Sequence, residues 1–344
     1  MLLVAALALG SQTWPQPVPP PPLVGFSFSP LSSIDAGRNP STDLKELLKT
    51  THPDLVRLPV YWDVVQPEPN RLDFSSVDSL LAAIAHHNRS SPVKTAVVLT
   101  VGARNFLYPE LHMPVWAGAR GQPDLDEAMA DAPYRAYFVE TIKRYRSSPL
   151  LYAWQVENEP LDNVVNEFTG DDQITPAQLE WEMAQVHALD PDHMAVTTTY
   201  NGINTAVDLL GLYAPPLVTH AGTVGHPNAA LRVGDALGLD AYIDGPSVPL
   251  RHVTSPGLRS EWKQQTVAMW AARARAQGKE LWLAEMQAQP WDGSGGFSPG
   301  DLVVGAKNYR EEPLQVVMLW GVETWLVDPD WMSAATQAMD VLRS

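Results

Sequence analysis

The chain has 344 residues, of which 45% are hydrophobic and 18% charged. This composition provides a sizeable core for one large α/β domain or two smaller ones and excludes a mainly disordered chain. The formal net charge of −16 argues against nucleic acid or an anionic membrane as partner and slightly favours a neutral one. Because there is no cysteine, disulfides, zinc–thiolate sites and thiol nucleophiles are excluded.

The N-terminus begins with an apolar run that ends in small residues within residues 1–10. This run is too short to span a bilayer and is typical of a signal peptide, although no Lys or Arg precedes it. Residues 11–22 form a proline-rich spacer, with six prolines in the eight residues from Pro15 to Pro22. We therefore expect an exported protein, with no membrane insertion of the mature part, whose residues 23–344 form one domain.

Apolar runs without polar alternation recur through this domain, as expected for parallel strands that are covered on both faces. The eight predicted strands are Leu23–Phe28, Leu55–Val60, Thr95–Val101, Leu151–Val156, Met194–Thr199, Ala236–Asp240, Leu281–Glu285 and Val316–Trp320. Helix-like segments lie between them, with capping residues at Ser75, Thr175 and Ser298. The pattern predicts a single (β/α)₈ barrel, whereas a doubly wound sheet would place a glycine-rich phosphate turn after an early strand.

Two of the predicted strands end on a carboxylate. The fourth leads directly into Asn158-Glu159-Pro160, and the seventh ends at Glu285. In a (β/α)₈ barrel, catalytic residues gather at the C-terminal ends of the strands. Cleavage of a glycosidic bond needs two carboxyl groups, one acid and one nucleophile or base. The sequence therefore predicts a glycoside hydrolase that uses Glu159 and Glu285.

Further strand-end residues give the chain a family resemblance. Over roughly residues 23–340 it resembles the retaining (β/α)₈ glycosidases known as clan A. The matching elements are Arg57, Asn158-Glu159-Pro160, Asp240-Ala241-Tyr242, Glu285, Trp320 and the stretch from Tyr61 to Phe74. The resemblance implies a β-glycoside substrate and a double displacement, with Glu159 as acid/base and Glu285 as nucleophile.

Several positions depart from the pattern of family 5. The third strand leads into Gly102-Ala103-Arg104 where that family has a histidine, and the sixth carries Asp240-x-Tyr242 in place of His-x-Tyr. The nucleophile strand continues into residues 286–291 without the usual Phe-Gly. With the segment 109–116, these departures indicate a divergent member near families 5, 39 and 42, so no substrate is carried over from any one family.

The neighbouring polar residues have expected roles in such a site. We expect Arg57 to keep Glu285 ionised and Tyr242 to donate a hydrogen bond to the same carboxylate. Asn158 is suited to the 2-hydroxyl of the sugar. Asp240 is either a substrate contact or a buried acceptor. Glu157 is expected to be a structural partner of another charge, because Glu157 and Glu159 cannot both face the site under strand alternation.

Aromatic residues that follow strand ends are candidates for stacking on sugar rings. These are Trp62, Trp116, Trp291, Trp320 and Trp325, with Trp320 the first choice, whereas Trp181 and Trp270 lie in helical patterns and are expected in the core. His112, His220 and His226 lie in loop-like segments and could contact hydroxyl groups. None has a metal-ligand spacing, so neither metal nor cofactor is expected.

Three alternatives stay open at this point. A transglycosylase would use the same residues while excluding water from the second step. A metal-dependent barrel would hold Mg²⁺ with Glu159, Asp240 and Glu285. A carbohydrate-binding barrel would retain the pocket without turnover. The partner expected is a neutral β-glycan; its sugar, the linkage, endo or exo action and the oligomeric state are left open by the sequence.

Overall fold

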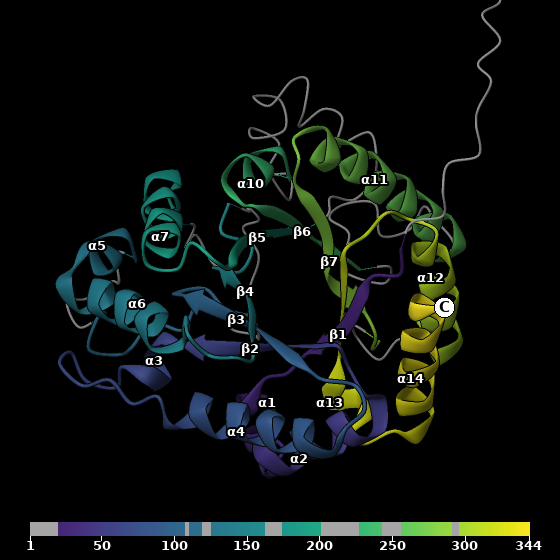
Figure 1. Cartoon of the computed structure of the whole chain (residues 1–344), viewed down its shortest axis with the longest axis horizontal. Helices are drawn as coiled ribbons and strands as arrows, with labels where there is room; N and C mark the ends of the chain where they lie inside the picture. Colours follow the sequence, from purple (N-terminus) through teal and green to yellow (C-terminus); the bar gives the residue numbers. More distant parts are fainter. Residues whose placement is uncertain are drawn as a thin grey trace, which may run out of the picture.

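Eight parallel strands close into one barrel, and they follow one another around it in chain order (Figure 1). The computed structural model describes residues 20–106, 110–118, 125–161, 174–200, 227–242, 256–290 and 296–344. The strands are β1 Leu23–Ser27, β2 Leu55–Tyr61, β3 Ala96–Gly102, β4 Leu151–Val156, β5 Met194–Tyr200, β6 Ala236–Ala241, β7 Glu280–Gln287 and β8 Val316–Trp320. All eight predicted strands are found, and the predicted barrel is confirmed. Residues 1–19, which include the predicted signal peptide, lie outside the described residues.

Helices surround the barrel (Figure 1). They are α1 Pro30–Asp35, α2 Pro40–Thr51, α3 Trp62–Val65, α4 Ser75–Ser90, α5 Leu125–Ala130, α6 Ala132–Tyr145, α7 Pro176–Leu189, α10 Pro227–Val233, α11 Pro256–Ala276, α12 Pro299–Arg310, α13 Val322–Trp325 and α14 Pro329–Arg343. Thr175 and Ser298 cap α7 and α12 as predicted, and Ser298 forms a capping box with Asp301. Ser75 is instead the first residue of α4, where its N–H donates to Asp73. Within the described ranges, no helix is long and apolar enough to cross a membrane.

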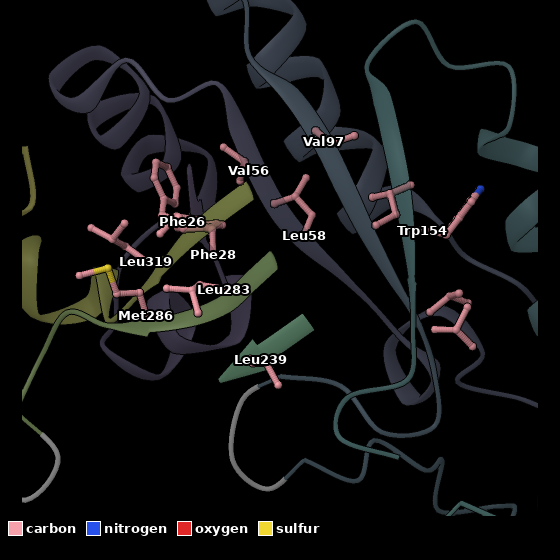
Figure 2. Packing of buried hydrophobic residues seen from close by; sticks show 14 of the residues in the cluster. Phe26, Phe28, Val56, Leu58, Val97, Trp154, Leu239, Leu283, Met286 and Leu319 are labelled. Atoms are coloured by element: carbon pink, nitrogen blue, oxygen red, sulfur yellow. The ribbon is translucent and has the colours of Figure 1, made fainter. Parts of the chain in front are cut away.

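The apolar core has two layers. The inner layer consists of strand residues alone, among them Leu55, Ala153 and Trp282, and it fills the barrel. The outer layer joins the opposite face of the strands to the helices, and Figure 2 shows part of it around Phe26 and Leu319. Successive residues of a strand face opposite layers. An inner-layer residue therefore fixes which polar residues further along its strand point into the barrel.

This alternation directs several polar side chains to the inside of the barrel near the C-terminal ends of the strands. Leu55 lies in the inner layer, so Arg57 follows it inward on β2. In the same way, Ala153 predicts an inward Gln155 on β4, and Met318 predicts an inward Trp320 on β8. The barrel therefore has an apolar floor and a polar mouth.

Strand β7 departs from this alternation just where it carries Glu285. Trp282 belongs to the inner layer and Leu283 to the outer, so strict alternation would point Glu285 outward. The register against β8 shifts between Leu283 and Met286, which inserts one extra residue into β7. Met286 consequently joins the outer layer, as Figure 2 shows. The bulge thereby turns Glu285 toward the barrel interior.

Candidate active site

Two side chains from opposite sides of the mouth, one on β2 and one just after β6, hold the carboxylate of Glu285. Arg57 donates from Nη2 to Oε1 at 2.5 Å, and the Tyr242 hydroxyl donates to Oε2. Glu285 is 5% exposed and Arg57 1% exposed. Because both oxygens have a donor, and one donor is a buried cation, the carboxylate is fixed in one orientation. The structure thus brings Arg57 and Tyr242 to the proposed nucleophile, as the sequence analysis expected.

Arg57 itself is anchored by contacts that do not involve Glu285. Its Nε donates to Ser27 Oγ at 2.8 Å, and its Nη1 donates to Gln155 Oε1 at 2.9 Å. The guanidinium also lies over the Phe106 ring, 4.1 Å from its centroid. All three nitrogens of the planar guanidinium group therefore donate to a partner, and the single ammonium group of a lysine could not reproduce this arrangement.

Removal of this buried cation is expected to destabilise the fold. In Arg57→Met, Glu285 would stay buried without its counter-charge, so the free energy of unfolding should fall by about 3–5 kcal/mol at neutral pH. Urea unfolding at pH 7 measures this loss, both in the wild-type background and in Glu285→Gln, where no buried carboxylate is left unpaired. The deficit should shrink in the Glu285→Gln background, and Arg57→Lys should lose less. An equal deficit in both backgrounds would mean that the pairing of charge is not its cause.

Glu159 lies where β4 ends, in an unusual backbone conformation. Both Glu157 and Glu159 have positive φ, 59° and 45°, which costs free energy in residues other than glycine and has to be offset by surrounding contacts. The Glu159 N–H donates to Thr198 Oγ1 at 2.9 Å, and its carbonyl accepts from Arg104 Nη1 at 2.9 Å. The residue is half-buried. Its backbone is thus held on both sides by polar contacts.

The Tyr242 hydroxyl lies in the field of several carboxylates. Burial raises the pKa of Tyr242 well above its ordinary value, and the negative charges of Glu285, Asp240 and Glu159 raise it further. Tyr242 is therefore a proton donor at any physiological pH, as its bond to Glu285 requires. Asp240, fully buried on β6, pairs with Glu285 in the register of the barrel.

Asn158 is buried beside Glu159 and is oriented by a residue that the sequence analysis did not select. Gln155 Nε2 donates to Asn158 Oδ1 at 3.0 Å, while Gln155 Oε1 accepts from Arg57. Gln155 therefore connects Arg57, which holds the nucleophile, to Asn158 at the end of β4. Its position, two residues after Ala153 of the inner layer, is the signal that could have identified it.

Glu157 faces away from this group and ties β4 to β3. Its carboxylate accepts from the backbone N–H groups of Ala103 and Arg104, at 2.8 and 2.6 Å. Gly102 leaves the space for it: a Cβ at Gly102, where φ is +142°, would lie 2.2 Å from the Glu157 side chain. The expected partner of Glu157 was a charged residue, and the structure instead shows backbone amides and Tyr134.

A second buried carboxyl, Glu182 on α7, lies on the far side of Tyr134. The Tyr134 hydroxyl bonds to both Glu157 and Glu182, and Gln178 donates to Glu182 at 2.9 Å. Burial raises the pKa of Glu157 to about 7, and burial together with the charge of Glu157 raises the pKa of Glu182 well above its ordinary value. Because Glu157 accepts two backbone N–H bonds, Glu182 is the carboxyl that keeps its proton at neutral pH.

This pair should make the fold less stable as the pH rises. The folded chain keeps protons that the unfolded chain releases near pH 4.3, so the free energy of unfolding falls from there to about pH 7 and above. Glu182→Gln keeps a neutral side chain at every pH, so the fall should be smaller in that variant. Urea unfolding at pH 5 and pH 8 measures it, with Glu180→Gln, exposed on the same helix, as the matched control. An unchanged difference in Glu182→Gln would contradict this account.

The aromatic residues have separate outcomes. Trp320 is half-buried at the end of β8, with its ring edge-on to Tyr242 at 5.8 Å, and thus borders the site. Trp62 was expected to stack on sugar, but it is fully buried among Trp116, Tyr134 and Tyr137. Its indole N–H donates to Gln66 at 2.7 Å. Trp62 therefore offers no face to a ligand, because α3 begins directly at the end of β2 and turns the ring into the core.

The other ring candidates are packed or lie elsewhere. Trp325 is 2% exposed and bonds to the Ala288 carbonyl, so it too is a core residue. His112 is 4% exposed and stacks on Tyr61 at 4.0 Å, which leaves little of its ring for a substrate hydroxyl. Trp291, His220 and His226 lie outside the described residues. Within the part of the chain that the structure describes, no three His, Asp or Glu residues are placed to hold a metal ion.

Arg104 and Glu110, which the sequence analysis did not select, form an ion pair at the β3 side of the mouth. Arg104 Nη2 donates to Glu110 Oε2 at 2.6 Å, while Nη1 holds the Glu159 carbonyl. Burial raises the pKa of Glu110, and the negative charge of Glu285 adds to this. The signal in the sequence was Arg104 itself, at the strand end where the family 5 histidine is absent.

Comparisons with known proteins return glycoside hydrolases. No family model matches the chain. A curated relative, mannan endo-1,4-beta-mannosidase F of Aspergillus clavatus, is 35% identical over 83 residues, which are 23% of this chain. The chain matches only 17% of the length of that relative.

The solved structures extend the likeness to nearly the whole chain. GH5_18 from Streptomyces cattleya in complex with GlcNAc matches 95% of this chain and 81% of its own, with 16% identity and a TM-score of 0.65. Its E153A variant in complex with Manb1-4GlcNAc matches 87% and 70%, with 16% identity and a TM-score of 0.60. At this identity the likeness shows the fold. Both comparisons agree with the enzyme class expected from the sequence, a hydrolase of O-glycosyl bonds, and confirm that the chain resembles the clan A (β/α)₈ glycoside hydrolases.

Proposed function

We propose that the protein is a retaining β-glycosidase that works by double displacement, with Glu285 as nucleophile and Glu159 as acid/base. The observation that carries the proposal is the fixed orientation of the Glu285 carboxylate. A bulge in β7 turns it toward the barrel interior, and Arg57 and Tyr242 each donate a hydrogen bond to one of its oxygens. A nucleophilic carboxylate has to be ionised and correctly aimed before substrate arrives. Arg57 supplies the charge and Tyr242 the second donor.

The first step would form an ester between Glu285 and the anomeric carbon. The bond from that carbon to the leaving oxygen breaks, and Glu159 gives its proton to this oxygen. The negative charge of Glu285 is then lost, but Arg57 keeps its bonds to Ser27 and Gln155. The guanidinium therefore stays in place for the second step. There, Glu159 takes a proton from water, the water oxygen attacks the anomeric carbon, and Glu285 is released.

Two of the comparison proteins guide the choice of substrate. The curated relative is named for mannan, and one structural neighbour was solved with Manb1-4GlcNAc. The net charge of −16 favours a neutral sugar. We therefore place β-mannosides first among the substrates for this protein, followed by the corresponding β-glucosides and β-galactosides.

The test is product formation from defined β-linked sugars. Manb1-4GlcNAc, β-1,4-mannooligosaccharides and β-1,4-glucooligosaccharides are each incubated with the wild type, and the products are identified by mass spectrometry and linkage analysis. Glu285→Gln serves as the blank. A shorter sugar that appears only with the wild type supports the proposal. Sugar that binds to the wild type and is never cleaved would indicate a carbohydrate-binding barrel, and loss of activity on chelation would indicate a metal-dependent enzyme.

A further inference from the structure

A further carboxylate, Glu323, lines a pocket at the β8 and β1 side of the barrel mouth. The pocket is lined by Ser27, Ser29, Phe106, Trp320, Gly321 and Glu323. It combines one half-buried ring, two hydroxyl groups and one carboxylate, and it has room for a single hydroxyl-sized group of a bound sugar. Neither the proposed nucleophile, Glu285, nor the proposed acid, Glu159, lines this pocket.

Arg57 connects the pocket wall to the nucleophile. Arg57 donates to Ser27 in the pocket wall and packs over Phe106, while its other end bonds to Glu285. The pocket wall is also braced from behind, since the Tyr61 hydroxyl donates to Ser29 Oγ at 2.8 Å or to the Phe106 carbonyl at 3.0 Å. A group in the pocket would therefore lie beside the sugar that Glu285 attacks.

The order of the strands indicates which part of the substrate this is. Glu159 follows β4 and has to protonate the leaving group, whereas most of the residues that line the pocket lie at the ends of β8 and β1, across the closed barrel from β4. Glu285 lies on β7, next to β8. A substrate that reaches both carboxyls thus has its leaving group toward β4 and its glycone toward the pocket.

The backbone brings Glu323 to this place by a close turn after β8. Gly321 has a φ of +129°, and a Cβ there would lie 2.6 Å from the Gln289 Cβ. Only glycine fits, so the chain can pass from Trp320 directly into α13, with Glu323 in its first turn. The alternative is that Glu323 only stabilises this turn, because its carboxylate accepts hydrogen bonds from its own backbone N–H and from Ser32. A carboxylate has about four acceptor positions, so these two bonds leave room for a ligand.

We infer that Glu323, together with Ser27 and Ser29, forms a subsite that recognises hydroxyl groups of a neutral glycone. This rests on the proposed function and adds the chemical class of the bound sugar. Burial raises the pKa of Glu323, and its own backbone N–H and Ser32 oppose this shift. In its ionised form the side chain accepts bonds from sugar hydroxyls and repels a sugar that carries its own carboxylate. The subsite therefore selects neutral hexosides over uronides.

The experiment uses 4-nitrophenyl β-glycosides of mannose, glucose, galactose and glucuronic acid. Loss of a charged hydrogen bond lowers kcat/KM for the preferred neutral glycoside by about 10- to 100-fold in Glu323→Ala. The monodeoxy analogues of that sugar identify the hydroxyl: for one of them, wild type and variant should be equally slow. The ratio of neutral to glucuronide activity should fall in Glu323→Gln, which keeps the shape of the side chain and its bond to Ser32.

The control is Asp330→Asn, an exposed acid in the first turn of α14, which should behave as the wild type. Thermal unfolding shows whether each variant is folded. If the wild type cleaves the glycosides and Glu323→Gln matches it on every sugar, with the same penalty for each deoxy analogue, the subsite is overturned and the proposed function stands. If the wild type cleaves no β-glycoside, the proposed function is overturned and the subsite with it.

Discussion

Glu285→Gln is expected to lower kcat by about 10⁴-fold or more on every substrate, whatever the leaving group. Glutamine fills the same space and can still accept from Arg57 or Tyr242, but its amide cannot form the glycosyl ester. The bonds of Arg57 to Ser27 and Gln155 would remain, so the fold should be kept. Steady-state kinetics with an aryl glycoside and with an oligosaccharide measure the loss.

The matched control for this substitution lies on the same strand. Glu280 begins β7, at the opposite end of the barrel, where it accepts from the Trp282 indole at 2.8 Å. Glu280→Gln preserves that bond and should leave kcat unchanged. If Glu285→Gln kept a tenth or more of the wild-type rate on all substrates, Glu285 would not be the nucleophile.

Glu159→Gln is expected to separate substrates by their leaving groups. An alcohol leaving group needs a proton, and general acid catalysis contributes about 10²–10⁴-fold, so hydrolysis of an oligosaccharide should slow by that factor. A 2,4-dinitrophenyl glycoside leaves without a proton, so its first step should be nearly unaffected. The backbone anchors of Glu159 to Thr198 and Arg104 would remain.

The comparison of the two leaving groups is its own control, because a misfolded variant would lose both activities together. The measured quantity is kcat/KM, which reports the first step alone, because the second step also uses Glu159 as a base. The ratio of dinitrophenyl to oligosaccharide kcat/KM should rise by about 10²-fold or more over the wild type. An equal loss of kcat/KM on both substrates would show that Glu159 does not act as the acid.

Most of the barrel could be predicted because parallel strands buried on both faces are nearly continuous apolar runs. Leu151–Val156 and Val316–Trp320 even have the predicted bounds. The inward direction of Glu285 could not be predicted, since it depends on an extra residue in β7 that is revealed by the register with β6 and β8. The sequence placed the residue at the correct strand end, while the bulge determines where its side chain points.

The errors among the site residues have similar causes. Trp62 follows a strand end, yet α3 begins there and buries its ring, so position after a strand did not imply exposure. Glu157 and Glu182 meet through Tyr134, and these three residues come from β4 and two different helices. Contacts of that kind depend on how helices pack on the sheet, which strand and helix periodicity does not specify. Gln155 is different, because it lies two residues after Ala153 on the same strand. Such residues face the same side of a sheet, so this relation could be read from the sequence.

The most direct test of the central claim is to trap the ester on Glu285. The enzyme is incubated with 2,4-dinitrophenyl 2-deoxy-2-fluoro-β-mannoside, or with the fluoro analogue of whichever hexoside it prefers. The fluorine slows both steps, but the dinitrophenyl group leaves readily, so the ester forms and accumulates. Mass spectrometry of the digested protein should then show one fluoro-sugar on the peptide that contains Glu285, and none in Glu285→Gln. A turnover-competent enzyme that forms no adduct and releases a first product of inverted anomeric configuration would contradict the double displacement.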